Sequence, residues 1–275
     1  MINSGKRIII DGANGFLGKS IFNHFNKKNN FELFKLTREL NYNFDDRNKY
    51  ILIIATGLFN GSITELVNSN IMRPLEVLTK LDKVISKVIL LSSGAVYGSQ
   101  FKDPRSKEND ILKSCDLYSA SKNSIESLIK LHLKGLKIPL TILRLPIIYS
   151  GNNLRGVLPN MLSSYSKKRI IKVYSSGKSV RDFLHIDDFL FALTNIIKYD
   201  IEGIYNISSD ATYSMFELAN IIVKQKSEII ISNKEPNALE KLSLDYSKAY
   251  NDFYYEPKFN SLKILDLFEM YGLTK

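Results

Sequence analysis

The sequence predicts an α/β fold: a doubly wound parallel sheet with a smaller C-terminal lobe. Strand-like and helix-like segments alternate through the first 150 residues, a glycine-rich turn follows the first strand, and the alternation stops after residue 150. Repeated strand–helix units are typical of parallel sheets covered by helices on both faces. The chain has 275 residues, 44% of them hydrophobic, and so can bury a sizeable core.

The expected strands of the first 150 residues are short apolar runs rich in β-branched residues. They cover residues 7–12, 31–37, 50–56, 87–93 and 140–149. Helices are expected between them, where apolar residues recur at helical spacing, at residues 16–25, about 65–86 and 118–135. Pro74 should kink or restart the second helix, and Gly135 should end the third.

After residue 150 the elements become shorter. A helix is expected over residues 183–199, a strand over 203–208, a polar loop over 232–261 and a last helix at about 261–271. We expect residues 1–149 and about 183–208 to form the larger domain. The smaller lobe then comprises residues from about 150 to 182 and from 209 to 275.

Composition excludes several functional classes. No apolar run reaches the ~20 residues that cross a bilayer, and the N-terminal apolar stretch is too short for a secretory signal. We therefore expect a cytoplasmic protein without a membrane segment. Cys115 is the single cysteine, and the three histidines, His24, His132 and His185, lack metal-ligand spacing. No disulfide and no metal site is expected.

The net charge of +10 raises the question of nucleic-acid binding, because basic proteins attract phosphate. The basic residues are dispersed, however, with no run longer than KKR at 167–169. A solvated surface is the favoured interpretation, and no specific nucleic-acid partner is expected. The same positive field would suit an anionic small molecule.

The segment DGANGFLG places Gly12, Gly15 and Gly18 between the first strand and the first helix. In a dinucleotide-binding loop, the first glycine permits the tight turn and the second lets the pyrophosphate approach the backbone. The third allows close helix–strand packing, and the helix N-terminus attracts the anion. This position after a strand and before a helix is the context that the motif requires, and it predicts a Rossmann-type domain that binds NAD(P).

The end of the second strand, KLTRE, bears on the choice of cofactor. A guanidinium at Arg38 suits the 2′-phosphate of NADP(H), whereas a carboxylate at Glu39 suits the ribose 2′-hydroxyl of NAD(H). We expect NADP(H) to be preferred and NAD(H) to remain possible.

The segment YSASK places Tyr118 and Lys122 four residues apart, on the same side of an expected helix. Upstream, LLSSGAVYG ends the fourth strand at Ser92 and Ser93. Taken singly, each residue has an ordinary structural explanation: Ser93 as a strand-end cap, Tyr118 as a half-buried aromatic and Lys122 as a solvated lysine. Together, after a glycine loop of this kind, they suggest a catalytic set.

Five segments in this order resemble the extended short-chain dehydrogenase/reductase family, and within it the NAD-dependent epimerase/dehydratase group that acts on nucleotide-activated sugars. They are GANGFLG, SSGAVYG, YSASK, LRLPIIY and VRDFLHIDDF. The resemblance runs from about residue 6 to about residue 210. It implies an enzyme with a nucleotide-sugar substrate. It also implies a homodimer, in which the helices at about 65–86 and 118–135 pair with those of a second copy.

The resemblance assigns roles to individual positions. Ser93, Tyr118 and Lys122 match the catalytic residues. The cofactor-binding set comprises Gly12, Gly15, Phe16, Leu17, Gly18, Arg38, Asp45, Asp46, Ala55, Asn70, Tyr118 and Lys122. Within it, Asp45 or Asp46 would contact the adenine. The substrate would contact Ser93, Tyr118 and Arg181.

The predicted chemistry is proton transfer coupled to hydride transfer. A free tyrosine has a pKa near 10, and we expect Lys122 and the positive nicotinamide to lower the pKa of Tyr118. Tyr118 would then exchange a proton with a sugar oxygen while hydride moves at the same carbon. Ser93 would hold that oxygen in place by a hydrogen bond.

Departures from the family pattern narrow the expected reaction. The family's 4,6-dehydratases usually carry Asp-Glu directly after the catalytic residue, whereas this chain has Gly94 and Ala95, so dehydration is not expected. The segment LTRE is similar to the corresponding segment of NADPH-using reductases. We expect an NADPH-dependent reductase of a nucleotide-linked 4-keto-6-deoxysugar that serves surface polysaccharide synthesis.

Two alternatives remain open. The first is an NAD-dependent nucleotide-sugar 4-epimerase, which Glu39 would suit, and the remote one is a non-catalytic RNA-binding member of the fold. Further positions also depart from the family pattern, among them Ser150, where glycine usually follows the tyrosine. Ile147 stands where the family often has a substrate-binding asparagine, and Asp11 stands where threonine or glycine is more common.

Overall fold

The structure is a computed structural model. It describes residues 5–37, 39, 44–98, 105–150, 156–174, 177–223, 228–231 and 241–259. The chain forms two compact units. The first comprises Met1–Val96, Leu112–Arg144 and Thr194–Tyr205, and the second comprises Tyr97–Ile111, Leu145–Leu193 and Asn206–Lys275. The predicted division into a larger domain and a smaller lobe uses other boundaries than these two units, and it stays a prediction.

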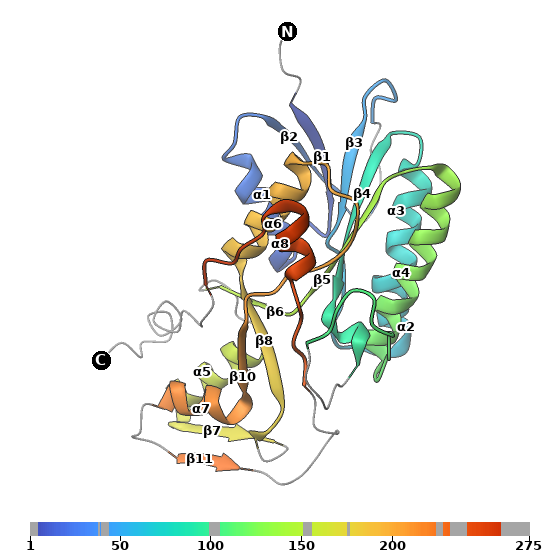
Figure 1. Ribbon diagram of the computed structural model, residues 1–275. Coiled ribbons are helices and arrows are strands. Elements are labelled where there is room, and N and C mark those ends of the chain that lie inside the picture. Colours follow the sequence, from blue (N-terminus) through green and yellow to red (C-terminus); the bar gives the residue numbers. More distant parts are fainter. Residues whose placement is uncertain are drawn as a thin grey trace. The chain divides into compact units, whose positions relative to one another are not determined.

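The first unit is built on a six-stranded sheet with the order β2-β1-β3-β4-β5-β9 (Figure 1). Its strands are β1 (Lys6–Asp11), β2 (Phe31–Lys35), β3 (Tyr50–Ile54), β4 (Ile85–Ser93), β5 (Leu140–Leu145) and β9 (Gly203–Asn206). β1 pairs in parallel with both β2 and β3, and β3 pairs in parallel with β4. β2 lies on one side of β1, and β3 and the later strands lie on the other side. This change of side creates the switch point at which open α/β sheets bind ligands.

Helices cover both faces of this sheet (Figure 1). They are α1 (Phe16–Asn26), α2 (Ile63–Val67), a π turn (Asn68–Met72), α3 (Arg73–Leu81), a 3₁₀ turn (Gly94–Tyr97), α4 (Leu117–Leu136) and α6 (Ile186–Lys198), which continues from the second unit into the first. One core cluster joins the central strands to α3 and α4, and it includes Leu52, Leu78, Leu90, Ile125 and Ile129. On the other face, His24 of α1 contacts Thr194 of α6 at 3.0 Å.

The second unit contains two small sheets, β10-β8-β6 and β11-β7. Its elements are β6 (Ile147–Tyr149), α5 (Val157–Lys168), β7 (Ile170–Val173), β8 (Val180–His185), β10 (Ala211–Ser214), α7 (Met215–Val223), β11 (Glu228–Ile231) and α8 (Ser247–Phe253). α5 and α7 pack on these strands around a core that includes Leu158, Leu162, Phe183 and Leu218. In neither unit is a described helix long and apolar enough to cross a bilayer.

The predicted fold class, a mostly parallel sheet with helices on both faces, is confirmed. The helix also restarts near Pro74 as predicted, because the π turn ends at Met72 and Pro74 lies in the first turn of α3. α4 runs one residue past Gly135, and Lys137 takes the left-handed conformation at its end.

Three predictions of elements were wrong. The strand expected over 140–149 is two strands, β5 and β6, because Pro146 lacks the N–H that would continue the ladder. The start of the helix expected over 183–199 is strand, since Phe183 pairs with both Ile147 and Ala211 in the small sheet. The stretch expected to be loop contains α8, and the helix expected at 261–271 lies outside the described residues.

Candidate active site

The glycine turn after β1 adopts the geometry that the sequence predicts. Gly12 has φ +80°, and a Cβ there would lie 2.7 Å from the backbone nitrogen of Thr56. The N–H of Gly15 donates to the carbonyl of Gly12 at 2.9 Å, which closes the turn. A Cβ at Gly18 would lie 2.8 Å from the Cα of Ala13, so the helix approaches the strand closely. Gly12 and Gly18 therefore require glycine for steric reasons, whereas a Cβ at Gly15 would meet only the carbonyl oxygen of Gly12, at 3.3 Å.

The N-terminus of α1 suits an anion. The helix begins at Phe16, followed by Leu17, with no acidic residue in its first turn and no cap from any described side chain. Its first N–H groups therefore have no intrahelical acceptor and point out of the helix end. The narrow turn and the helix end together fit the pyrophosphate of a dinucleotide.

Asp11, the unusual residue at the end of β1, is buried and paired. Its Oδ1 accepts a hydrogen bond from Nη2 of Arg73 at 2.8 Å, and the same Nη2 donates to the carbonyl of Thr37 at 2.8 Å. Thr56 donates its hydroxyl to the other carboxylate oxygen of Asp11. This contact set ties the carboxyl ends of β1, β2 and β3 together beside the glycine turn.

The residues predicted to surround the adenosine lie partly outside the described chain. Arg38 is among the residues that the structure does not describe, so its predicted role stays a prediction, and Glu39 is exposed. Asp45 is half-buried and forms a two-point ion pair with Arg47, with N–O distances of 2.8 and 2.9 Å. The bonds from Arg47 lower the pKa of Asp45 to about 2.

The neighbouring predicted positions differ in their surroundings. Asp46 is exposed, whereas Ala55, which directly follows β3, donates its N–H to the carbonyl of Asp11 at 2.9 Å. Ala55 therefore lies at the switch point of the sheet, beside the glycine turn. The adenine contact predicted for Asp45 or Asp46 remains a prediction.

Asn70 lies in the π turn and is buried. Its side-chain oxygen accepts from the N–H of Leu58 at 2.6 Å, while its amide donates to the carbonyl of Leu58 at 2.9 Å and to the hydroxyl of Ser121 at 2.8 Å. Asn70 thus holds the loop after β3 against α4, the helix that carries Tyr118 and Lys122. π turns inside helices are frequent at functional sites.

The predicted catalytic residues converge from two elements. Ser93 is the last residue of β4 and Tyr118 lies in the first turn of α4, and the Ser93 side chain is near enough to the Tyr118 hydroxyl to favour its ionised form. Lys122 follows one turn later and donates from Nζ to the carbonyl of Leu91 at 3.1 Å. Gly57 approaches the same ammonium group, since a Cβ there would lie 3.0 Å from Nζ.

The start of α4 is fixed by a reciprocal cap. Asp116 Oδ1 accepts from the N–H of Ser119 at 2.6 Å, and Ser119 Oγ accepts from the N–H of Asp116 at 3.1 Å. A cap of this kind satisfies two backbone donors that a helix start leaves unpaired. Tyr118 lies between these residues, so the cap fixes the backbone from which its side chain extends.

Two features near Tyr118 were not predicted. The ring of Phe59 packs edge-on against Tyr118 with centroids 4.9 Å apart, although Phe59 itself is exposed. Gly57 and Phe59 belong to the segment ATGLFN directly after β3. Gly57 and Phe59 could have been predicted as site residues because they lie in a loop at the carboxyl end of a central strand, where open α/β sheets bind ligands.

The burial of Tyr118 opposes one expectation. Burial raises the pKa of Tyr118 above 10.0, and the hydrogen bond with Ser93 only partly opposes this effect. We predicted a lowered pKa, on the basis of Lys122 and an oxidised nicotinamide. Lys122 is itself buried, and desolvation lowers its pKa to about 8. In the chain alone, Tyr118 therefore holds its proton at neutral pH.

Arg181, the predicted substrate contact, lies on β8 in the second unit, opposite Tyr213 of β10. It is half-buried, and its Nη1 donates to the carbonyl of Val180 at 3.0 Å. Its role toward substrate stays a prediction.

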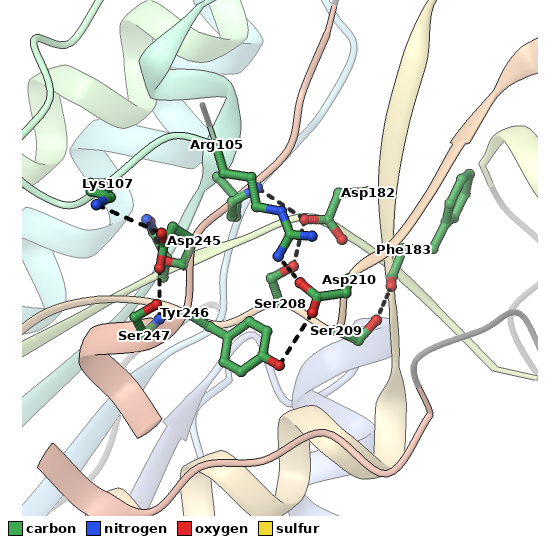
Figure 2. A network of polar contacts seen from close by, with 12 residues as sticks. Arg105, Lys107, Asp182, Phe183, Ser208, Ser209, Asp210, Asp245, Tyr246 and Ser247 are labelled. Carbon is green, nitrogen blue, oxygen red and sulfur yellow. Dashed lines mark hydrogen bonds and ion pairs between the residues drawn. The ribbon is translucent and has the colours of Figure 1, made fainter. Parts of the chain in front are cut away.

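A polar network that the sequence did not predict organises the same unit (Figure 2). Asp182 is completely buried, and its Oδ2 accepts from the hydroxyl of Ser208 at 2.5 Å and from the N–H of Leu244 at 3.1 Å. Nearby, Arg105 forms an ion pair with Asp210. These contacts join segments that lie far apart in the sequence, and burial raises the pKa of Asp182 to about 7.

Comparisons with known proteins agree with this geometry. The model of the NAD dependent epimerase/dehydratase family matches residues 8–208. A dTDP-D-glucose 4,6-dehydratase from Dictyostelium discoideum is 28% identical over 223 residues, which are 73% of this chain and 50% of the relative. A GDP-6-deoxy-D-talose 4-dehydrogenase from Aggregatibacter actinomycetemcomitans is 24% identical over 299 residues, 96% of this chain and 97% of the relative.

Solved structures show the same fold. A tyrosine-to-phenylalanine variant of the UDP-glucuronic acid 4-epimerase of Bacillus cereus, crystallised with UDP-4-deoxy-4-fluoro-glucuronic acid and NAD, superposes with a TM-score of 0.82 at 18% identity, over 97% of this chain and 98% of that one. The chain spans about half the length of some relatives, 50% of the Dictyostelium protein and 46% of UDP-glucuronic acid decarboxylase 1 from Arabidopsis thaliana.

Proposed function

This chain belongs to the NAD-dependent epimerase/dehydratase family, of the extended short-chain dehydrogenase type, and from that premise we propose that it is an NADPH-dependent reductase of a nucleotide-linked 4-keto-6-deoxysugar. The observation that carries the proposal is the convergence of Ser93, Tyr118 and Lys122 at the end of β4. The glycine turn and the open N-terminus of α1 fit a dinucleotide. When bound, NADPH supplies the hydride.

Tyr118 can act as the proton donor that reduction requires at the sugar oxygen. Burial raises the pKa of Tyr118 and so favours its protonated form. The reduced nicotinamide is uncharged and adds no positive charge that would lower this pKa. Tyr118 gives its proton to the carbonyl oxygen, Ser93 holds that oxygen by a hydrogen bond, and Lys122 stabilises the phenolate that remains.

Two further observations support this choice. Gly94 and Ala95 open a 3₁₀ turn directly after Ser93, where water elimination would need an additional acid and base. The Aggregatibacter relative, matched over nearly its whole length, is named for dehydrogenation at C4 of a GDP-linked 6-deoxysugar. Chemically, that reaction is the reverse of 4-keto reduction. The preference for NADPH itself rests on Arg38 in the sequence.

Absorbance at 340 nm tests the proposal. The purified protein is mixed with NADPH and each of a panel of dTDP-, CDP- and GDP-4-keto-6-deoxyhexoses. We expect NADPH oxidation with at least one of them, and a faster rate with NADPH than with NADH. No oxidation across the panel would refute the proposed reaction, and an equal rate with NADH would refute the cofactor preference.

A nucleotide-sugar 4-epimerase is the second candidate, and the exposed Glu39 just after β2 favours it. An epimerase must first oxidise its substrate, and it retains NAD(H) between turnovers. NAD(H) that copurifies with the protein and is released only on denaturation would support this candidate. Protein purified without nucleotide, and with weak NAD affinity, would count against it.

We further propose that the protein is a cytoplasmic homodimer whose product serves surface polysaccharide synthesis. Helices of the first unit expose several large apolar side chains, which a second copy would cover: Ile63, Val67, Met72, Leu128 and Leu131. Light scattering tests the assembly, and a monomeric mass at assay concentration would contradict it.

A further inference from the structure

The row formed by Tyr118 and Lys122 continues by one residue. Glu126 lies four positions after Lys122 on α4, so all three side chains share one face of the helix. Glu126 is buried, as is Arg144 on β5, and side chains of this charge are seldom fully buried without a partner.

The Glu126 carboxylate joins three elements behind the catalytic residues. Its Oε2 accepts from Nη2 of Arg144 at 2.8 Å, and its Oε1 accepts from Nε of the same residue at 3.2 Å. Oε1 also accepts from the hydroxyl of Ser92 at 2.5 Å. Ser92 directly precedes Ser93 on β4. The carboxylate therefore holds the strand of Ser93 against the helix of Tyr118 and Lys122.

Packing alone does not require charges at these positions. A buried ion pair costs desolvation, and apolar residues of similar volume often stabilise a core equally well. The position of the pair beside Lys122 gives its charge a further effect. Burial disfavours the charged form of Lys122, and the negative charge of Glu126 opposes that effect.

Among the residues that the structure describes, other neighbours of Lys122 carry little charge. From β4 it meets the backbone carbonyl of Leu91, from the loop after β3 it meets Gly57, and the π turn contributes the neutral amide of Asn70 near Gly57. On its own helix it has Tyr118 on one side and Glu126 on the other. Positive and negative groups thus alternate from Arg144 through Glu126 to Lys122, which lies one helical turn from Tyr118.

We propose that Glu126 is a positioning residue of the reaction: it keeps the ammonium of Lys122 charged and holds Ser93 in register with Tyr118, while Arg144 balances its charge. This inference rests on the proposed function, because it concerns the same three catalytic residues. It predicts that charge at Glu126 acts on Lys122 even when no substrate or cofactor is bound.

Trace labelling of lysine amines with acetic anhydride across a pH series, read by mass spectrometry, tests this directly. Only the uncharged amine reacts, so the labelling reports the charge of Lys122 without any turnover. In Glu126→Gln we expect Lys122 to label about fivefold faster than in the wild type near pH 7, because removal of a nearby negative charge disfavours the charged amine. The exposed Lys134 on the same helix, eight positions after Glu126, serves as the internal control, with unchanged labelling.

Two matched variants separate charge from packing. Ser92→Ala removes a hydrogen bond to Glu126 but keeps its charge, so the labelling of Lys122 should stay within twofold of wild type. Arg144→Met leaves the Glu126 charge unbalanced, so Lys122 should label more slowly. General loosening of the core would instead speed labelling in all three variants, and that result would overturn the inference.

If Glu126→Gln does not fold, the double variant Glu126→Gln/Arg144→Met tests the inference instead, because it removes both charges and leaves neither buried without its partner. We expect at least threefold faster labelling of Lys122, and labelling within twofold of wild type overturns the inference. In an active enzyme, Glu126→Gln should also move the alkaline limb of the kcat profile to lower pH. The labelling result stands whether or not any sugar nucleotide of the panel is reduced, so the two proposals fail separately.

Discussion

Replacing Gly12 by alanine tests the cofactor turn at its narrowest point. The φ of +80° lies in the left-handed region, which costs an L-residue about 1–2 kcal/mol. The new Cβ would lie 2.7–2.9 Å from backbone atoms of Ala55 and Thr56, which cannot rotate away as a side chain would. Overpacking of this kind costs about 1–3 kcal/mol. Gly12→Ala should therefore lower the free energy of unfolding by about 2–5 kcal/mol.

Gly135→Ala is the matched control. Gly135 is exposed near the end of α4, and a Cβ there meets nothing within 4 Å. Alanine in a helix interior is favoured over glycine by about 0.5–1 kcal/mol, so this variant should be stabilised. Urea unfolding measures both changes, and NADPH fluorescence measures cofactor affinity. A Gly12→Ala protein that unfolds within 0.5 kcal/mol of wild type and binds NADPH equally well would refute the assigned turn.

Three further substitutions test the surroundings of the site and the second unit. Burial raises the pKa of Asp182 from 3.8 to about 7 in the folded protein, so Asp182 keeps a proton there that the unfolded chain has lost. The free energy of unfolding should therefore fall as pH rises between these two values. Asp182→Asn should flatten this pH dependence in urea unfolding, and an unchanged slope would contradict the assignment. Asn70→Leu leaves several buried groups unpaired and should cost about 2–4 kcal/mol, while a loss below 1 kcal/mol would contradict its role. Arg73→Met leaves Asp11 buried and unpaired, at a cost of about 3–5 kcal/mol, and Asp11→Asn/Arg73→Met should recover most of it in thermal unfolding. No recovery in the double variant would show that the two residues do not act as a pair.

Local patterns predicted the parts of the molecule that depend on neighbours in sequence. The strands β1 to β4 are apolar runs, and the glycine turn is recognisable from its spacing after β1. The i,i+4 spacing of Tyr118 and Lys122 correctly indicated a shared helix face, and Ser93 at the end of β4 completes the set. Each of these signals lies within a few residues of the feature that it predicts.

Features that depend on distant partners were not predicted. Strand at Phe183 follows from pairing with β6 and β10 rather than from its own neighbours, and the carboxylate of Asp182 requires segments far from it in the chain. Glu126 follows Lys122 at the same four-residue spacing that separates Lys122 from Tyr118, which the sequence shows. Its bond to Arg144, however, depends on which strands lie under α4, which the sequence does not show. The direction of the pKa shift of Tyr118 was missed because burial is a tertiary property.

The measurement closest to the central claim is turnover by Tyr118→Phe with a ketone substrate that the wild type reduces. This substitution removes only the hydroxyl that Ser93 contacts, so the dissociation constant for NADPH should stay within about threefold of wild type. Loss of a positioned proton donor should slow the reaction by about 10²–10⁴-fold. Turnover by the phenylalanine variant at the wild-type rate, with cofactor bound equally well, would contradict the role of Tyr118 as the proton donor.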